Sequence, residues 1–337
     1  MSTWLPTHME EKPLKITFVS WARHVPRSKG IASALHARDY YVEYMKGTSL
    51  IFLPLRYLLQ IVKTCVILFR EKPRLVIVMN PPILLPFIVY LFTKFASARF
   101  VIDSHTGAFI GKWSLFLQVH KYLSRKALVT IVTNDYLKQR VESWGARAIV
   151  LEDKLPDFTI QRCSKALDRP SVCFISSFAQ DEPLKNVLLA AAGVPGCVFY
   201  VTGQLPNRET KLLRDKPGNV VFTGFLAEEK YIELLNKVDA IMVLVTNDHT
   251  MLCGAYEAVA VQKPLITSDW PVLRRYFNRG TLYVDNSPQG IERAVSEVLL
   301  SKAQLAVEMR ELKRTLSKQW TSRLKILESV IASSVEH

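Results

Sequence analysis

Short apolar runs alternate with longer helix-like runs along the whole chain. In the first half, four runs are short, continuously apolar and bounded by polar residues, which is typical of buried strands. They are Lys15–Trp21, Leu75–Met79, Arg99–Ser104 and Leu128–Thr133. The segments between them are long enough for helices. Alternation of this kind predicts an α/β domain with a parallel sheet covered on both faces.

The second half repeats the pattern. Its predicted strands are Val172–Ser176, Val198–Thr202, Val220–Thr223, Ala240–Val245, Pro264–Thr267 and Leu282–Val284. Helices are expected between them, for example over Ala227–Lys237 and Gly254–Val261. Leu155–Arg169 has no clear period and is interpreted as a linker, and the tail from Ser287 is predicted to be nearly continuous helix with a break near Trp320. We therefore expect two doubly wound domains with a ligand cleft between them.

The longest uncharged stretch is Leu75–Thr93, which approaches the ~20 residues needed to span a bilayer. It contains Asn80, Pro81 and Pro82, and two adjacent prolines disfavour a helix through that point. A strand, a turn and then an apolar helix from about Ile83 are the better prediction.

The preceding segment, Ser49–Lys72, is apolar but carries Arg56, Lys63 and Arg70, which are spaced seven apart and so share one stripe of a helix. A basic stripe on an apolar helix suits the headgroup boundary of an anionic membrane. The same pattern fits a core helix that shows its polar stripe to water.

Charge distinguishes the two halves. The formal net charge of the chain is +14. Residues 1–156 contain 22 Lys and Arg and 10 Asp and Glu, whereas residues 157–337 contain 22 Lys and Arg and 20 Asp and Glu. A one-sided basic field attracts nucleic acid, anionic lipid or phosphorylated ligands, unless it is only a solvated face. A nucleic-acid groove would interleave aromatic and basic residues. Here the basic residues mix with aliphatic runs, so we expect peripheral attachment to an anionic membrane and no nucleic acid.

Several kinds of site are not indicated. The five cysteines are odd in number and form no Cys-x-x-Cys pair, which argues against a disulfide framework or a zinc ribbon and fits a reducing cytoplasm. No signal-peptide pattern is visible. Dinucleotide, P-loop and nucleophile-elbow motifs, Asp-x-Asp pairs and metal-ligand clusters are missing from the sequence. We therefore expect no metal and no cofactor other than a substrate.

Ligands of doubly wound sheets bind beyond the carboxyl ends of the strands, so the residues there are the candidates. Asp103 and His105 end the third predicted strand and could supply a base and its partner, although a helix cap with a structural histidine is the alternative. Ser177 follows the strand at Val172. Lys185 falls in the first turn of a helix opened by Pro183, where an anion would offset the unfavourable dipole.

The most specific pattern follows Ala240–Val245. A loop through His249 ends at Cys253 and Gly254, where a helix begins that carries Glu257 in its first turn. A glycine-opened helix after a strand is an anion site. Glu257 is placed to accept hydrogen bonds from a ribose, or it only offsets the helix dipole. Gly203 and Phe225 also follow predicted strands, where each glycine-containing turn could be an ordinary one.

The run from Gly254 to Pro264 resembles the donor-binding helix of glycosyltransferases with the GT-B fold, especially family 4. Asn80-Pro81-Pro82 and Ser176-Ser177-Phe178 with Asp181-Glu182 also resemble the cytosolic β-mannosyltransferases that extend dolichol-linked chitobiose. The resemblance implies two Rossmann-like domains facing a central cleft. Residues 1–156 would bind the acceptor and face the membrane, residues 157–318 would bind the nucleotide sugar, and residues 319–337 would form a helix crossing back to the first domain.

The resemblance also implies roles for single residues. Glu257 matches the ribose-binding glutamate, Gly254 the diphosphate-binding turn and Lys185 the phosphate-binding lysine. Gly203 and Phe225 fall where relatives line the nucleotide pocket, and His105 falls where they place a histidine in the cleft.

Two departures stand out. His249 occupies the place of a second glutamate of family 4, and Ser177 lies near a missing arginine. Both put the retaining outcome of that family in doubt. If the enzyme inverts, Asp103 or His105 is the natural base.

Together these patterns predict a metal-independent glycosyltransferase that moves a sugar from a UDP- or GDP-linked donor to a polyprenyl-linked acceptor. We expect it to act peripherally at the cytoplasmic face of the cell membrane, in polysaccharide or glycan assembly for the cell envelope. Arg56, Lys63, Arg70 and Asn80 are the candidate acceptor or membrane residues, and a partner membrane protein is compatible with this placement. A nucleotide-sugar epimerase and an inactive glycosyltransferase-like subunit are the alternatives.

Overall fold

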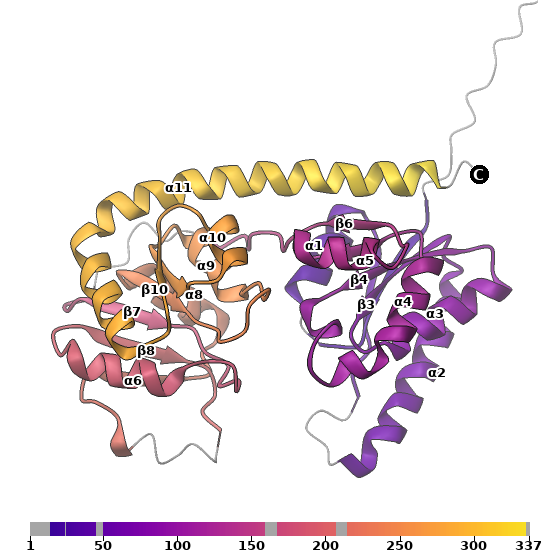
Figure 1. Ribbon diagram of the computed structural model, residues 1–337. Coiled ribbons are helices and arrows are strands. Elements are labelled where there is room, and N and C mark those ends of the chain that lie inside the picture. The colour runs from indigo at the N-terminus through magenta and orange to yellow at the C-terminus, as the bar shows by residue number, and fades with distance from the viewer. Residues whose placement is uncertain (1–13, 24, 45–49, 159–166, 207–213, 335–337) are drawn as a thin grey trace, which may run out of the picture. The chain divides into compact units, whose positions relative to one another are not determined.

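The structure is a computed structural model that describes residues 14–23, 25–44, 50–158, 167–206 and 214–334. The chain forms two compact units. Unit 1 comprises Met1–Val150 together with Glu328–His337, and unit 2 comprises Leu151–Leu327. Each unit contains one six-stranded parallel sheet with helices around it (Figure 1). The predicted α/β class with two doubly wound sheets is confirmed.

Unit 1 has the strand order β2-β1-β3-β4-β5-β6. The strands are β1 (Ile16–Ser20), β2 (Arg38–Tyr41), β3 (Leu75–Asn80), β4 (Arg99–Ser104), β5 (Thr130–Val132) and β6 (Ala148–Val150). β1 and β3 are buried along their whole length, as expected for continuously apolar strands of a parallel sheet. The order reverses between β1 and β3, so this is the switch point of the sheet.

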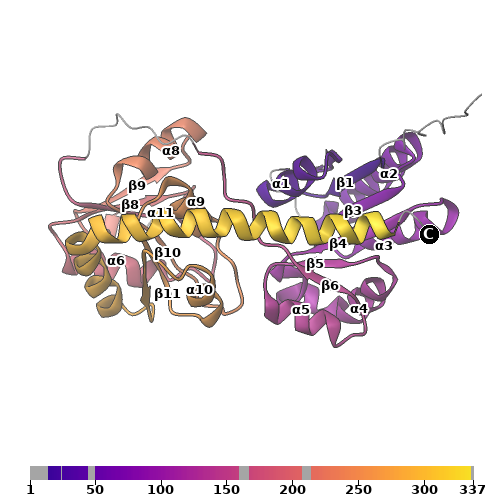
Figure 2. The same ribbon diagram turned by 90° about the horizontal axis from the view of Figure 1, so that it is seen from above.

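The helices of unit 1 are α1 (Pro26–Ala34), α2 (Leu53–Glu71), α3 (Leu84–Phe95), α4 (Leu117–Lys126) and α5 (Asp135–Glu142), and a 3-10 segment, Gly111–Phe116, leads into α4. Right-handed crossovers from β2 to β5 place α2, α3 and α4 on the same face of the sheet. α3 packs against both α2 and α4. Figures 1 and 2 show these three helices in a row on one side of the sheet, with α1 on the other.

Unit 2 has the strand order β12-β11-β10-β7-β8-β9. The strands are β7 (Ser171–Phe174), β8 (Val198–Thr202), β9 (Val220–Gly224), β10 (Ala240–Val243), β11 (Leu265–Ser268) and β12 (Thr281–Val284). The helices are α6 (Leu184–Gly193), α8 (Glu228–Lys237), α9 (Cys253–Val261), α10 (Pro271–Tyr276) and α11 (Pro288–Ser333). Here the switch point lies between β7 and β10.

Helix α9 is buried on nearly every side, which its almost wholly apolar sequence requires. Its residues Ala255, Tyr256 and Val259 belong to one core cluster with Leu312 and Leu316 of α11. This core fixes the start of α9 against the sheet.

Helix α11 is continuous, so the predicted break near Trp320 is wrong. No glycine or proline follows Gly290 within the helix, and nothing in the sequence interrupts its hydrogen bonds. Trp320 is buried and its Nε1 donates to the carbonyl oxygen of Glu152 at 3.1 Å. The tryptophan marks a packing contact and not a break. The last residues of the helix, from Glu328, belong to unit 1.

Every predicted strand is present, but the sequence analysis missed two. β2 carries the charged and aromatic sequence Arg-Asp-Tyr-Tyr, and β6 has only three residues. Both are edge strands, which are often short or polar and therefore give a weak apolar signal. Within the described ranges, no helix combines the length and the apolar character needed to cross a membrane.

Candidate active site

The carboxyl end of β4 in unit 1 holds a buried ion pair. Asp103 is fully buried, and its Oδ1 accepts hydrogen bonds from Arg27 Nε at 2.9 Å and Nη2 at 2.7 Å. Burial alone would raise the pKa of Asp103, but the charge of Arg27 and the hydrogen bond with His105 outweigh it and lower the pKa from 3.8 to about 2. Asp103 is thus an ionised, inaccessible carboxylate that cannot itself contact a substrate.

His105 follows directly, and its side chain is 29% exposed. Its Nε2 lies 3.3 Å from Asp103 Oδ2, and its backbone N–H donates to the carbonyl oxygen of Asn80 at 2.8 Å. Because an ionised carboxylate only accepts, Nε2 must carry the proton in this contact. In the neutral ring, Nδ1 is then the atom with a lone pair. Of the two predicted bases only His105 is partly exposed, and Asp103 holds its ring. The role of His105 as a base stays a prediction.

Asn80 is the residue whose carbonyl oxygen accepts this bond from the His105 N–H. It is buried at the end of β3, and its Nδ2 donates to Ser104 Oγ at 3.3 Å. Ser104 Oγ is also 2.9 Å from Nε2 of buried His120. Burial and the nearby Arg140 lower the pKa of His120 to about 4, so its ring is neutral at neutral pH. In this structure Asn80 supports the backbone of β4 and is not exposed to an acceptor.

The three basic candidates of unit 1 lie on α2. Lys63 and Arg70 are exposed, whereas Arg56 is partly buried with its guanidinium carbon 5.3 Å from the centre of the Tyr57 ring.

The switch point of unit 2 brings the start of α9 against β7 and β10. A Cβ atom at Gly254 would lie 3.0 Å from side-chain atoms of Ile175 and Val243, so the helix approaches the sheet as closely as a glycine allows. Leu252 precedes the helix and provides no side-chain cap. The Ala255 N–H donates to the carbonyl oxygen of Leu252 at 3.0 Å. The positive end of the helix dipole at this terminus favours an anion.

A turn after β7 holds a second set of donors. The carboxylate of Glu182 accepts hydrogen bonds from the N–H groups of Ser177 and Phe178 at 2.9 and 3.0 Å and from the hydroxyls of Ser176 and Ser177 at 2.5 and 2.7 Å. These donors are already used within the chain. Ser177 therefore supports this turn in the structure, and the anion-binding capacity of the switch point rests on α9.

Gly203 borders the same turn. Its φ is +94°, and a Cβ there would lie 2.2 Å from the carbonyl oxygen of Ser176. Any other residue would displace the turn after β7. The loops beyond β7 and β10 are also joined, because the Thr246 N–H donates to the carbonyl oxygen of Asp181 at 2.8 Å.

Glu257 projects from α9 toward α8. Its Oε2 accepts a hydrogen bond of 2.5 Å from the Tyr231 hydroxyl. Burial raises the pKa of Glu257, and the bond from Tyr231 opposes that shift. Within the described residues Oε1 has no partner, so this oxygen is the one available to a ligand hydroxyl.

The remaining predicted donor residues are spread over the same end of unit 2. Cys253 is the first residue of α9 and is exposed, with its Sγ 4.0 Å from Asp153 Oδ2. His249 lies in the loop before α9 with a positive φ of 62°. Lys185 is exposed in the first turn of α6, and Phe225 is exposed directly after β9. The roles of these four residues stay predictions.

Sequence reasoning missed Arg27, Tyr231 and the function of Glu182 as an internal acceptor. Arg27 pairs with a residue 76 positions away and Tyr231 with one 26 positions away, and no local spacing reveals such pairs. Glu182 could have been suspected, because a serine pair followed closely by a carboxylate favours a side-chain-capped turn.

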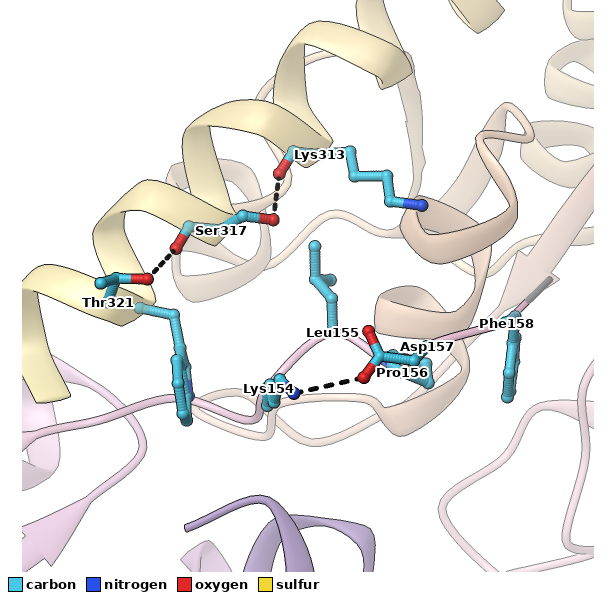
Figure 3. Close-up of a pocket in the computed structure, with 9 residues that line it drawn as sticks. Lys154, Leu155, Pro156, Asp157, Phe158, Lys313, Ser317 and Thr321 are labelled. Atoms are coloured by element: carbon cyan, nitrogen blue, oxygen red, sulfur yellow. Dashed lines mark hydrogen bonds and ion pairs between the residues drawn. The ribbon is translucent and has the colours of Figure 1, made fainter. Parts of the chain in front are cut away.

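A hollow of about 350 Å³ lies elsewhere in unit 2, between the segment after β6 and α11 (Figure 3). Its size would admit a small ligand. Its charged groups are already paired, however: Lys154 Nζ lies 3.2 Å from Asp157 Oδ2, and Lys313 Nζ donates to the carbonyl oxygen of Ala260 at 2.7 Å. The hollow is therefore not the candidate site. The described part of the chain also contains no cluster of three or more metal-ligating side chains.

Two Rossmann-like units, each with its polar groups at the carboxyl ends of parallel strands, define the GT-B class of folds. Solved structures with this fold match nearly the whole chain. Sucrose-phosphate synthase from Thermosynechococcus elongatus is 13% identical, with a TM-score of 0.73 over 96% of this chain and 99% of that one. HepE of Anabaena, in complex with UDP and glucose, is 13% identical, with a TM-score of 0.70 over 95% and 100%. A Listeria monocytogenes protein assigned as a UDP-N-acetylglucosamine 2-epimerase is 12% identical, with a TM-score of 0.67 over 96% and 98%.

A protein-family model matches part of unit 2. It is the model of the family described as "Glycosyl transferases group 1", and it matches residues 157–316. The matched range contains α9 with Gly254 and Glu257, the region on which the resemblance was based. No curated protein matches the sequence.

Proposed function

We propose that the protein is a glycosyltransferase that moves a sugar from a nucleoside diphosphate sugar to a polyprenyl-linked acceptor. The observation that carries the proposal is the start of α9, which presents an uncapped helix N-terminus beside Glu257 within the residues matched by the family. The complex of HepE with UDP and glucose favours a uridine nucleotide, and a guanosine nucleotide is the second candidate.

Each candidate residue then has a task. The diphosphate of the donor lies at the N-terminus of α9 at Gly254, and Oε1 of Glu257 accepts a ribose hydroxyl. As the bond from the sugar to the diphosphate breaks, negative charge grows on the leaving nucleotide, and the oriented N–H groups stabilise it. This arrangement needs no metal ion.

The acceptor side is served by unit 1. His105 Nδ1 removes the proton of the acceptor hydroxyl. At the same time the oxygen of that hydroxyl forms the new bond to the sugar carbon, and the bond from this carbon to the diphosphate breaks. The buried carboxylate of Asp103 holds the ring and stabilises the imidazolium that results, and Arg27 keeps that carboxylate ionised. Attack from the face opposite the leaving group inverts the anomeric configuration.

The nature of the acceptor rests on the first half of the chain. Its basic surplus suits a phosphorylated, lipid-borne acceptor, and its resemblance to β-mannosyltransferases of dolichol-linked chitobiose points the same way. On this basis we place the protein peripherally at the cytoplasmic face of the cell membrane, in assembly of envelope polysaccharide.

An epimerase is the second candidate, because the Listeria protein shares the fold. The basic first half favours the transferase, since an epimerase of soluble nucleotide sugars needs no lipid-facing surface. An inactive subunit remains the third candidate because His249 replaces a family glutamate.

The test is a transfer assay in EDTA with labelled UDP- and GDP-sugars and polyprenyl-diphosphate-linked oligosaccharides. We expect label to enter the lipid phase with equimolar release of nucleoside diphosphate, and Glu257→Ala to abolish both. Conversion of the nucleotide sugar without labelled lipid would favour the epimerase. Neither reaction, with donor binding also missing, would favour the inactive subunit.

A further inference from the structure

The outer surface of the α2, α3 and α4 row is unusually apolar. Of the 23 large hydrophobic side chains that are exposed in the described part of the chain, 16 lie between Ile51 and Tyr122. Isolated exposed hydrophobic residues need no explanation, but a contiguous group of them marks an interaction surface.

Helix α2 has three distinct sides. Gln60, Thr64, Ile67, Leu68 and Glu71 are buried against the unit. The side that faces solvent is formed by Leu55, Leu58, Val62, Val66 and Phe69, which recur every three or four residues and are 46–63% exposed. The stripe of Arg56, Lys63 and Arg70 borders this side. The alternative of a core helix that shows only its polar stripe to water therefore does not describe α2.

The neighbouring helix continues the apolar side. Phe87, Leu91 and Phe95 recur at four-residue spacing along α3, and Phe95 is 86% exposed. Phe69 of α2 contacts Phe92 of α3, with ring centres 5.6 Å apart. The two outer sides are thus adjacent.

The segment Gly111–Lys126 extends it further. Leu115, Phe116 and Val119 are exposed there, and Leu115 is 83% exposed. The hydroxyl groups of Tyr90 on α3 and Tyr122 on α4 are 2.9 Å apart, which joins this segment to α3. We call the exposed side chains of α2, α3 and Gly111–Lys126 the apolar face.

No exposed carboxylate accompanies the apolar face. Between Ile51 and Lys126 the sequence holds 11 Lys and Arg and only two acidic residues, Glu71 and Asp103. Both are buried and paired, Glu71 with Lys15 and Arg38 and Asp103 with Arg27. All uncompensated charge on this surface is therefore positive.

Aromatic rings and ammonium groups meet around the apolar face. Lys94 lies 4.9 Å from the Tyr90 ring, Lys126 lies 5.7 Å from the Tyr122 ring and Lys112 lies 5.7 Å from the Trp113 ring. Tyr and Trp beside Lys and Arg are typical of the boundary between hydrocarbon and lipid headgroups.

We propose that the apolar face inserts into one leaflet of an anionic lipid bilayer, with the surrounding lysines and arginines on the headgroups. A protein partner or a second copy of the chain would need carboxylates or neutral polar groups to match this charge, whereas anionic headgroups around hydrocarbon supply both chemistries at once. The proposal deepens the lipid-linked acceptor of the proposed function, but the binding itself requires neither donor nor acceptor.

The test is co-sedimentation of the full chain with protein-free vesicles, either of phosphatidylcholine alone or of phosphatidylcholine mixed with phosphatidylglycerol. We expect binding to the mixed vesicles, weakened but not abolished at ~1 M salt, where charges are screened within about 3 Å. The triple variant Leu58→Gln, Val62→Gln, Val66→Gln should bind at least ~10-fold less, because apolar area then no longer enters the membrane.

The matched control makes the same chemical change at exposed apolar positions of unit 2, Leu189→Gln, Leu300→Gln and Val307→Gln. This control should bind like the parent chain. Thermal melting of both variants checks that they fold, and Phe95→Gln with Leu115→Gln tests the same surface at two other sites.

No binding to either vesicle would overturn the proposal, as would binding that salt abolishes and the glutamine variants leave unchanged. Concentration-dependent dimers that the triple variant dissolves, without vesicle binding, would assign the apolar face to a second copy and also overturn it. Donor binding is measured separately, so a failure of the apolar face is distinguishable from a failure of the glycosyltransferase proposal.

Discussion

The two units share an architecture and differ in their surfaces. Residues 1–156 carry a net charge of +12 and residues 157–337 carry +2, as the counts of 22 against 10 and 22 against 20 show. Of the 23 exposed large hydrophobic side chains in the described ranges, 17 belong to the first segment. Both sheets pack against buried apolar cores, so folding does not explain the difference in charge and in exposed apolar side chains. The difference agrees with the proposals that unit 1 binds an anionic lipid surface and that unit 2 binds a nucleotide sugar.

The polar ends of the two sheets differ in kind as well. Unit 1 places charged side chains there, with a buried Arg27–Asp103 pair behind His105. Unit 2 places backbone N–H groups there, at the start of α9. Side-chain chemistry can move a proton, whereas a helix terminus can hold an anion but transfers nothing. The comparison therefore fits the proposed function, in which unit 1 transfers the proton and unit 2 binds the donor.

The largest effect should come from removing the proposed base. His105→Ala is expected to slow sugar transfer by roughly 10²–10⁴-fold, the usual contribution of a general base. Its donor affinity should not change, because the donor is assigned to unit 2. Transfer kinetics and calorimetric titration with the donor measure the two quantities.

His36→Asn is the control for that variant, since His36 is an exposed histidine of the same unit and asparagine tolerates its φ of 51°. It should transfer at the parent rate. If His105→Ala lost donor affinity but transferred sugar from bound donor at the parent rate, the assignment of the base to unit 1 and of the donor to unit 2 would be contradicted.

The ion pair behind His105 should matter next, for stability. Asp103→Asn leaves the buried Arg27 without its counter-charge and is expected to cost about 3–5 kcal/mol of unfolding free energy, as for other broken buried pairs. Adding Arg27→Met should recover much of the loss. Urea unfolding measures both, and Glu229→Gln, at an exposed carboxylate of unit 2, should change stability by less than ~0.5 kcal/mol.

The same pair predicts a pH dependence. The pKa of Asp103 is about 2 in the folded chain against an ordinary 3.8, so the unfolded chain binds the proton more readily. This contribution to stability is complete above pH 4 and is lost as the pH falls from about 4 toward 2. Asp103→Asn should lack that part of the profile. An unchanged acid profile in the variant would show that the pair does not hold unit 1 together.

A smaller effect is expected from Tyr231→Phe, which removes the hydrogen bond to Glu257. Donor affinity should fall by about 0.5–1.5 kcal/mol, the usual net value of one such bond. The bond from Tyr231 lowers the raised pKa of Glu257, so without it the loss of affinity on acidification should begin at higher pH. Vesicle binding should be unaffected.

Tyr283→Phe is the matched control, because it removes a tyrosine hydroxyl that donates to the Phe277 carbonyl oxygen, also within unit 2. Equal loss of donor affinity in both variants would mean that Tyr231 acts only through general stability.

Much of the fold follows from the order of apolar runs. Strands such as Arg99–Ser104 and Val198–Thr202 have the bounds that the sequence predicts, because each contains an uninterrupted apolar run that ends at polar residues. β2 was missed because it is an edge strand without an apolar run, and β6 was missed because it has only three residues. The supposed break in α11 came from reading an isolated Trp320 as a boundary, although the tryptophan is a packing anchor on an unbroken helix.

The candidate site was predictable only where it is local. Gly254 and Glu257 lie three residues apart on one helix, so their spacing in the sequence was enough to predict that they lie close together. Arg27 and Asp103 are far apart in the sequence and are brought together only by the fold. The sequence also does not show that Glu182 accepts the hydrogen bond from the Ser177 N–H. The outward direction of the apolar residues of α2 also required the structure, since apolar periodicity alone does not say whether that side faces a core.

The most direct test of the central claim is thermal melting of the full chain with a panel of nucleotide sugars in EDTA. A ligand that binds only the folded state adds about 2.7 kcal/mol at a hundred times its Kd. We predict that one nucleotide sugar raises Tm, that Glu257→Ala loses the shift and that His105→Ala keeps it. No shift from any uridine, guanosine, adenosine or thymidine diphosphate sugar, or equal loss of the shift in both variants, would contradict the assignment of donor binding to unit 2.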